Sequence, residues 1–196
     1  MTRIQHPPEK SSHLTLWFGL LGTVALAVGL IYYLQAQAEK KKNGQVNYLK
    51  AVPSEQELRV RLNKEQYHVM REGGTEPPFH NQYNDNQRPG IYVDLITGEP
   101  LFSSTDKFDN GLGLPSFTKP IAKEHIVFRK DTSHDMERVD VRSKLSDSHL
   151  GYLFNDGPPP TNQRYTVNSA ALHFVPLEKM KEEGYSEFLP LFEQKQ

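Results

Sequence analysis

The chain has 196 residues, a formal net charge of −1 and 36% hydrophobic residues. This size and composition predict one modest globular domain with an appendage. The near-neutral charge gives no basic excess, so we expect no nucleic acid among the partners. Cysteine is absent, which excludes disulfides, thiolate zinc sites, iron–sulfur clusters and thiol catalysis by the chain's own residues.

The N-terminal part contains a long uncharged segment. Residues 1–13 form a polar tail, and residues 14–34 follow without a charged side chain. At about 1.5 Å per residue, a helix of this length spans the ~30 Å hydrocarbon core of a bilayer. Trp17 near one end and Tyr32 and Tyr33 near the other are typical of membrane interfaces. We therefore predict a transmembrane helix over residues 14–34 and a lipid bilayer as its partner.

Small residues lie along one side of the predicted membrane helix. Gly22, Ala25 and Gly29 would let a second helix approach closely. The alternative is that glycine and alanine are simply common in membrane helices. If the small residues do form a contact face, we expect other membrane-protein subunits as partners.

The flanks of this segment leave cleavage and orientation open. Ala36-Gln37-Ala38 has the form of a signal-peptidase site, but the apolar run is long for a signal peptide, which favours an uncleaved anchor. The positive charges of Arg3 and Lys10 on one side of the segment nearly balance those of the lysines at residues 40–42 on the other side. We expect a single-pass protein with its body outside the cytoplasm, at a bacterial inner membrane facing the periplasm or at a mitochondrial inner membrane.

A polar linker and then the body follow the apolar segment. Residues 35–56 are rich in Lys, Gln and Glu and predict a linker, which places the body at residues 57–196. Residues 57–72 predict a single helix with an imperfect apolar face, ended by Gly73-Gly74. Near the C-terminus, residues 177–183 predict a short amphipathic helix.

Short strand patterns separated by turn residues fill most of the body. Such a pattern predicts a mostly β, antiparallel domain. The predicted strands are 90–96, 100–102, 126–128, 138–142, 149–154, 164–167 and 171–175.

Six sequence blocks stand in a characteristic order along the body: EGGTEPPF (72–79), GIYVDLITGEPLFSSTDKFDNG (90–111), LPSFTKPI (114–121), VRSKLSDSHLG (141–151), LFNDGPPP (153–160) and RYTVNSAALHFVP (164–176). Their order resembles a known family, the peptide-methionine (R)-S-oxide reductases called MsrB or SelR. The resemblance covers roughly residues 58–189 and implies two antiparallel sheets with peripheral helices. It also implies a shallow site for the R epimer of methionine sulfoxide, so a peptide that contains this residue is a further expected partner.

Many members of the family hold a structural zinc ion with two Cys-x-x-Cys pairs. Asp94, Thr97, Ser143 and Ser146 stand at those four positions in this chain, as in the zinc-free branch of the family. Oxygen ligands in this arrangement make a poor tetrahedral zinc site. We therefore expect no metal and no other cofactor.

The catalytic positions implied by the resemblance are also replaced. The family's nucleophile is the cysteine of an RYCxN block, and Thr166 stands there. A GCGWPSF block contains the resolving cysteine and a tryptophan that packs on the substrate methyl group, and these positions are Leu112 and Leu114. The second histidine of an HLGH block is Tyr152. We expect that no residue of this site is catalytic.

Four other residues match family positions that surround the pocket. They are His149, Asp156, Arg164 and Asn168. The resemblance implies that they shape a residual pocket, whereas a purely structural role in holding loops and strand ends is an equal alternative.

Two functions follow from these observations. The first is a membrane-anchored, catalytically inactive member that acts as a binding or scaffold subunit of a membrane complex. The second is an oxidoreductase that reduces methionine (R)-sulfoxide in proteins with an external thiol. The absence of cysteine favours the first function.

Overall fold

The computed structural model describes residues 30–32, 34–35, 48–133 and 136–193. It divides into two units, Met1–Gln45 and Val46–Gln196. Residues 30–32 and 34–35 are helical. Within the described ranges, no helix has the length and apolar character needed to cross a bilayer. Most of the predicted span 14–34, including Gly22, Ala25 and Gly29, lies outside the described residues, so the predicted anchor stays a prediction.

The body begins with two short helices rather than the single helix that we predicted. Helix α2 spans Glu55–Arg61 and helix α3 spans Lys64–Glu72. The break arises because the side chain of Asn63 caps α3 by accepting from Gln66 N at 2.8 Å, which requires an extended backbone at Asn63. Gly73 ends α3 in the left-handed conformation (φ 73°), as a C-terminal glycine does.

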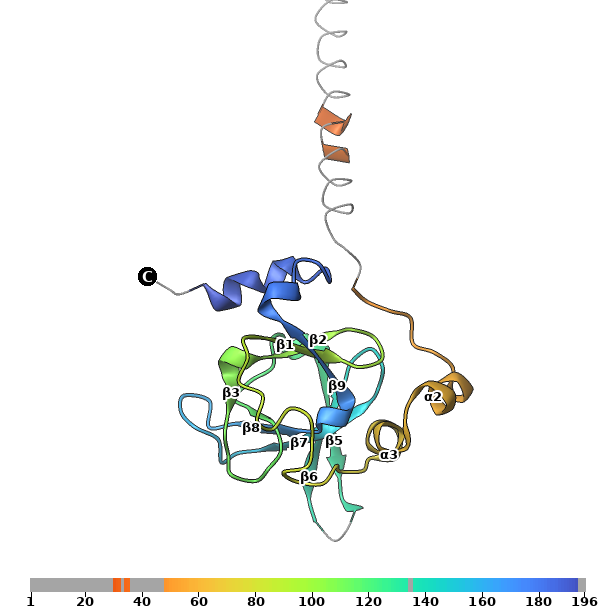
Figure 1. The fold of residues 1–196 in the computed structure, drawn as a ribbon, viewed down its shortest axis with the longest axis vertical. Coiled ribbons are helices and arrows are strands. Elements are labelled where there is room, and N and C mark those ends of the chain that lie inside the picture. Colours follow the sequence, from red (N-terminus) through yellow and green to blue (C-terminus); the bar gives the residue numbers. More distant parts are fainter. Residues whose placement is uncertain (1–29, 33, 36–47, 134–135, 194–196) are drawn as a thin grey trace, which may run out of the picture. The chain divides into compact units, whose positions relative to one another are not determined.

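A small sheet forms one layer of the body (Figure 1). It has three antiparallel strands in the order β2-β1-β9. The strands are β1 (Gly90–Asp94), β2 (Pro100–Ser103) and β9 (Leu172–Pro176).

A larger antiparallel sheet has the order β3-β4-β8-β7-β6-β5. Its strands are β3 (Lys107–Phe108), β4 (Ser116–Phe117), β5 (Ile126–Asp131), β6 (Arg138–Ser143), β7 (His149–Phe154) and β8 (Arg164–Val167). The expected mostly β domain of two antiparallel sheets is confirmed. Strands β3 and β4 were not predicted because two residues are too few to show an alternating pattern.

The core lies between the two sheets and under α3, which packs against β7 (Figure 1). Phe102 and Phe117 stack there at 4.6 Å between ring centroids, and Tyr92 meets Phe117 edge-on at 5.1 Å. All three rings are fully buried, so they fix the two sheets face to face.

Several 3₁₀ turns lie between the strands or follow the last strand. They are η1 (Ser104–Asp106), η2 (Lys123–His125), η4 (Ser169–Ala171), η5 (Leu177–Lys179) and η6 (Ser186–Phe192). The helix predicted over residues 177–183 is wrong in type, because only the 3₁₀ turn η5 and hydrogen-bonded turns form there. Tyr48 stacks on Tyr185 at 4.5 Å, so the start of the described body lies on this C-terminal segment.

Candidate functional site

One row of side chains crosses the large sheet through β8. Thr166 pairs with Ser116 of β4 on one side and with Tyr152 of β7 on the other, and Tyr152 pairs with Asp140 of β6. Directly paired residues of antiparallel strands point to the same face of the sheet. The row therefore brings the predicted residues Thr166 and Tyr152 together, with two polar residues that the sequence alone did not indicate.

The hydroxyl group of Thr166 is hydrogen-bonded on both sides. Its Oγ1 accepts from Arg164 Nη1 at 2.7 Å and shares a hydrogen bond of 3.1 Å with Ser116 Oγ. Ser116 Oγ in turn accepts from Asn110 Nδ2 at 2.6 Å. Thr166 is only 8% exposed, so this hydroxyl is part of an internal network and does not face an open space.

The guanidinium of Arg164 is fixed by a two-pronged contact with Asp156. Nε and Nη2 each donate to one carboxylate oxygen at 2.8 Å, a planar geometry that suits arginine. The ring of Phe154 lies 4.1 Å beneath the guanidinium carbon. The hydrogen bonds from Arg164 hold the pKa of Asp156 below its ordinary value. The predicted pair Arg164 and Asp156 therefore does meet Thr166, through the third donor nitrogen of Arg164.

Tyr152 is fixed by two contacts to its ring. The guanidinium of Arg138 lies 4.1 Å from the centre of the ring, and the imidazole of His149 meets the ring edge-on at 5.0 Å. The carboxylate of Asp131 lies close enough to its hydroxyl to perturb it electrostatically. Burial raises the pKa of the phenol, so Tyr152 is neutral at physiological pH.

His149 is buried and uses one ring nitrogen. Its Nδ1 lies 2.6 Å from Asp140 Oδ1, while Nε2 is buried without a hydrogen-bond partner in the described part of the chain. Burial alone would raise the pKa of Asp140, but the contacts with His149 and Arg142 outweigh it and lower that pKa. His149 is thus held in place beside Tyr152 by an ionised carboxylate.

Asn168 lies apart from this cluster and has a structural environment. Its Nδ2 donates to the carbonyl of Leu150 at 3.0 Å, and its Oδ1 accepts from Glu76 N at 2.9 Å. The buried carboxylate of Glu76 then accepts from Ser169 N and Ala170 N. Asn168 therefore ties the segment after α3 to the end of β8.

The two leucines at the other replaced positions lie on the loop before β4. Leu112 is 53% exposed, and Leu114 is half-buried. The backbone of this loop is fixed by Asn110, whose Oδ1 accepts from Leu112 N at 2.7 Å. The loop thus places two aliphatic side chains near the strand that carries Ser116.

The four positions that correspond to zinc ligands in other members are buried and hydrogen-bonded to each other or to a neighbouring carboxylate. Asp94 Oδ1 accepts from Thr97 Oγ1 at 2.9 Å, and Asp94 Oδ2 accepts from Ser146 Oγ at 2.7 Å. Ser143 Oγ donates to Glu99 Oε2 at 3.0 Å. The donors and acceptors at these positions are therefore paired with each other or with Glu99, where other members of the family bind a metal ion. Among the residues that the structure describes, no cluster of three or more His, Asp or Glu side chains could hold a metal ion.

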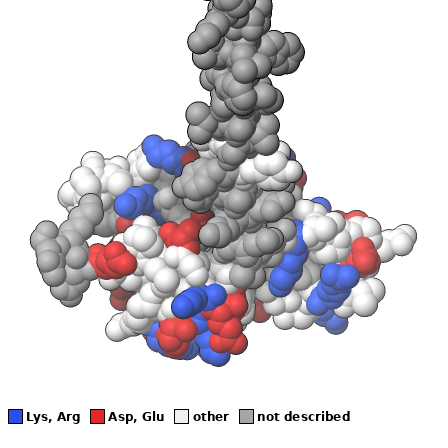
Figure 2. All heavy atoms as spheres, turned by 90° about the horizontal axis from the view of Figure 1, so that it is seen from above, with Lys and Arg blue, Asp and Glu red and all other residues white. Residues whose placement is uncertain are grey.

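The charge on the surface is mixed. Figure 2 shows acidic and basic side chains interspersed over one face of the molecule, so that face presents no extended surface of a single sign.

The arrangement around Thr166 holds polar groups and no thiol. Every predicted residue of the site except Asn168 and the two leucines takes part in one connected cluster across β4, β8, β7 and β6. Sequence reasoning missed four members, namely Asp131, Arg138, Asp140 and Ser116. No local signal marks Asp131, Arg138 and Asp140, because their place beside Tyr152 depends on the pairing of β5, β6 and β7.

Comparisons with known proteins agree with this architecture. The family model of the SelR domain matches residues 62–176. The "Peptide methionine sulfoxide reductase MsrA/MsrB" of Vibrio cholerae serotype O1 is 52% identical over 153 residues, which cover 78% of this chain and 40% of that protein. The chain thus spans about two fifths of the length of this curated relative.

Proposed function

Because the chain belongs to the SelR domain (MsrB) family, we propose that it is a member without the family's thiol chemistry, which acts as a binding subunit held at a membrane. The observation that carries this proposal is the environment of Thr166. Its hydroxyl stands at the nucleophile position and is bonded to Arg164 and Ser116.

The chemistry of sulfoxide reduction explains why the hydroxyl cannot replace a thiol. Two electrons must reach the sulfur while its oxygen leaves as water, and two thiols supply them by becoming a disulfide. The 196 residues contain no cysteine. If the hydroxyl has a pKa like that of water, forming its anion costs roughly 10 kcal/mol more than forming a thiolate. An oxygen nucleophile would also leave an oxygen–oxygen bond with no sulfenic counterpart.

The hydrogen-bond donors around the site support the same conclusion. A sulfoxide oxygen needs donors that are free to bind it. Arg164 is directed at Asp156 and Thr166, and the amide of Asn168 donates to Leu150. These polar groups are therefore used to hold the fold together, and His149 Nε2 is a site nitrogen that stays without a partner in the described part of the chain.

The apolar segment 14–34 supports the membrane part of the proposal. A domain without catalytic thiols that carries such a segment has more evident use for its surfaces than for its pocket. The partner would be another membrane protein that contacts the small residues Gly22, Ala25 and Gly29. Substituting Gly22 and Gly29 with Leu should then shift the full-length chain to a smaller complex in native gels. Unchanged migration would argue against this part of the proposal.

A reductase that takes its electrons from an external thiol is the second candidate. The 52% identity to a protein named as a peptide methionine sulfoxide reductase favours it. In this case a free dithiol would have to attack the sulfoxide directly while the cluster around His149 binds the substrate.

One assay separates the two candidates. The full-length chain, incubated with a peptide that contains methionine (R)-sulfoxide and with dithiothreitol, should give no turnover above the blank without protein. Thr166→Cys should give at most a trace of single-turnover product, because Tyr152 is a weaker acid than a histidine near neutral pH and Leu114 offers no indole face. Thr75→Cys places a thiol at an exposed threonine and is the matched control. Turnover by the unmodified chain would establish the external-thiol reductase instead.

A further inference from the structure

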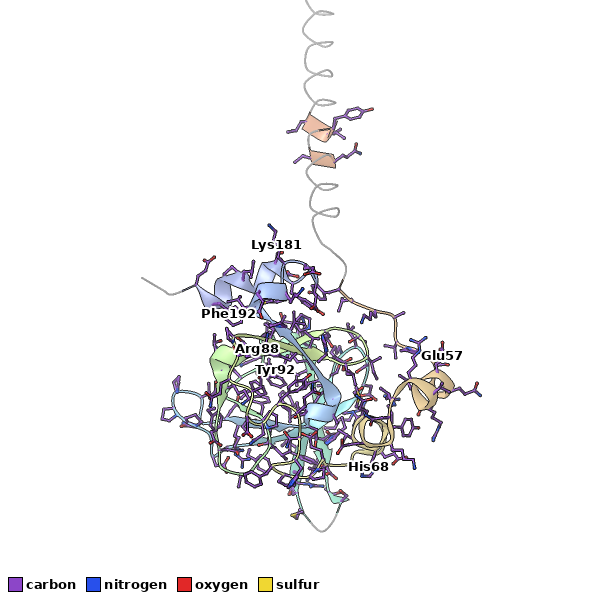
Figure 3. All side chains as sticks on the ribbon, in the orientation of Figure 1. Glu57, His68, Arg88, Tyr92, Lys181 and Phe192 are labelled. Atoms are coloured by element: carbon purple, nitrogen blue, oxygen red, sulfur yellow. The ribbon has the colours of Figure 1, made fainter. Side chains whose placement is uncertain are left out.

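A cavity away from Thr166 lies between the loop after α3, the β2–β3 connection and the C-terminal segment. Its volume is about 430 Å³, within the range of small-molecule sites. Figure 3 labels Arg88 and Phe192 on this side of the body. The lining residues are Asn84, Asp85, Asn86, Gln87, Pro89, Ser104, Thr105, Lys107, Phe108, Asp109 and Phe192.

The loop that forms one wall is held rigidly in place. Asn86 Nδ2 donates to the hydroxyl of Tyr92 at 3.0 Å, and Asn84 N donates to Asn81 Oδ1 at 3.1 Å. The carbonyl of Pro89 accepts from Leu177 N at 2.9 Å. A ligand that binds this wall would therefore not have to order it first, which lowers the cost of binding.

The charged groups of the cavity disfavour an anionic ligand. Lys107 is half-buried, and its Nζ donates to the carbonyl of Asn84 at 2.7 Å. It forms no ion pair with the residues that the structure describes, and burial lowers its pKa. Asp85 and Asp109 also line the cavity, so two carboxylates and one ammonium give the lining a net charge of −1. Such a lining suits a neutral ligand that both donates and accepts hydrogen bonds.

The remaining groups indicate which neutral ligand fits. Gln87 has no hydrogen bond with any other described side chain, and the side-chain amide of Asn84 uses its nitrogen on Asp85 and leaves its oxygen available. Two phenyl rings, Phe108 and Phe192, complete the lining. Carboxylates and amides bind vicinal hydroxyl groups, and aromatic faces pack on the C–H face of a sugar ring. We propose that this cavity binds a neutral saccharide.

The test measures saccharide binding to the full-length chain in a detergent without a sugar headgroup. Maltotriose, cellotriose and tri-N-acetylchitotriose are the probes, and saturation-transfer NMR detects ring protons that contact the protein. We expect transfer to at least one of them at millimolar concentration. Gln87→Ala and Phe108→Ala should each weaken the dissociation constant about five- to tenfold.

Two matched variants control for general effects. Gln82 is an exposed glutamine on the same loop that lines a different cavity, and Phe128 is a half-exposed phenylalanine on β5. Gln82→Ala and Phe128→Ala should leave binding unchanged. Absence of transfer to all three saccharides, equal weakening by the control variants, or transfer only to a neutral tripeptide such as triglycine would overturn the proposal.

Discussion

The hydroxyl of Thr166 gives the sharpest test of the site's structural role, because two substitutions separate its polar and apolar parts. Thr166→Val keeps the shape but removes the acceptor of Arg164 Nη1 and the partner of Ser116. Arg164 is only 7% exposed, and a buried charged donor without its acceptor costs about 2 kcal/mol of the free energy of unfolding. Thr166→Ser keeps both hydrogen bonds and loses one buried methyl group, which costs about 1 kcal/mol.

The expected order of stability is therefore wild type, then Thr166→Ser, then Thr166→Val. This order opposes β-strand propensity, which favours valine over serine. Urea unfolding followed by circular dichroism resolves a difference of about 1 kcal/mol as a midpoint shift of roughly 0.3–1 M. Tryptophan fluorescence is unsuitable, because the only tryptophan is Trp17, outside the body. Thr75→Val, at an exposed threonine, is the control. If Thr166→Val is as stable as Thr166→Ser, the hydroxyl does not hold the site together.

Two further outcomes concern other parts of the sheet. The pKa of Asp140 is lowered in the folded state, so its contact with His149 stabilises the fold fully above the ordinary aspartate pKa of about 3.9, and this stabilisation is lost as the pH falls through the folded pKa. The difference in the free energy of unfolding between wild type and Asp140→Asn should therefore shrink from pH 7 to pH 3 in urea titrations. A constant difference would contradict this. Gly151→Ala would place a Cβ atom 2.0 Å from the carbonyl oxygen of Thr166 and should lower the free energy of unfolding by about 3 kcal/mol or prevent folding. In Gly111→Ala the new Cβ meets no atom within 4 Å, so this variant should lose about 1 kcal/mol. Similar melting temperatures for the two variants would show that strands β7 and β8 can move apart at Gly151.

Much of the fold could be predicted because the strand patterns and turn residues are local. The bounds of β7 and β8 agree with the prediction to the residue. The break between α2 and α3 could not be read from the apolar pattern, which continues across it. The break depends on Asn63, whose side chain caps α3 and whose extended backbone ends the helical run that α2 begins.

The site was predicted less completely than the fold. Thr166, Arg164 and Asp156 form one hydrogen-bonded group, whereas Asn168 is hydrogen-bonded to Glu76 and Leu150. Asp131 and Arg138 could not be found from sequence, since their place beside Tyr152 depends on the pairing of β5 with β6. Long-range pairing of this kind leaves no local signal in the chain.

The network around Asp94 has a mechanical consequence. It joins the turn after β1, in the small sheet, to the turn between β6 and β7, in the large sheet, through Ser146 and through Glu99 with Ser143. The two sheets are thereby joined by hydrogen bonds between hydroxyl and carboxylate groups, and these bonds depend on neither metal supply nor thiol oxidation. The body should consequently melt as one cooperative unit in the presence of chelators or peroxide, and neither reagent should open one sheet before the other.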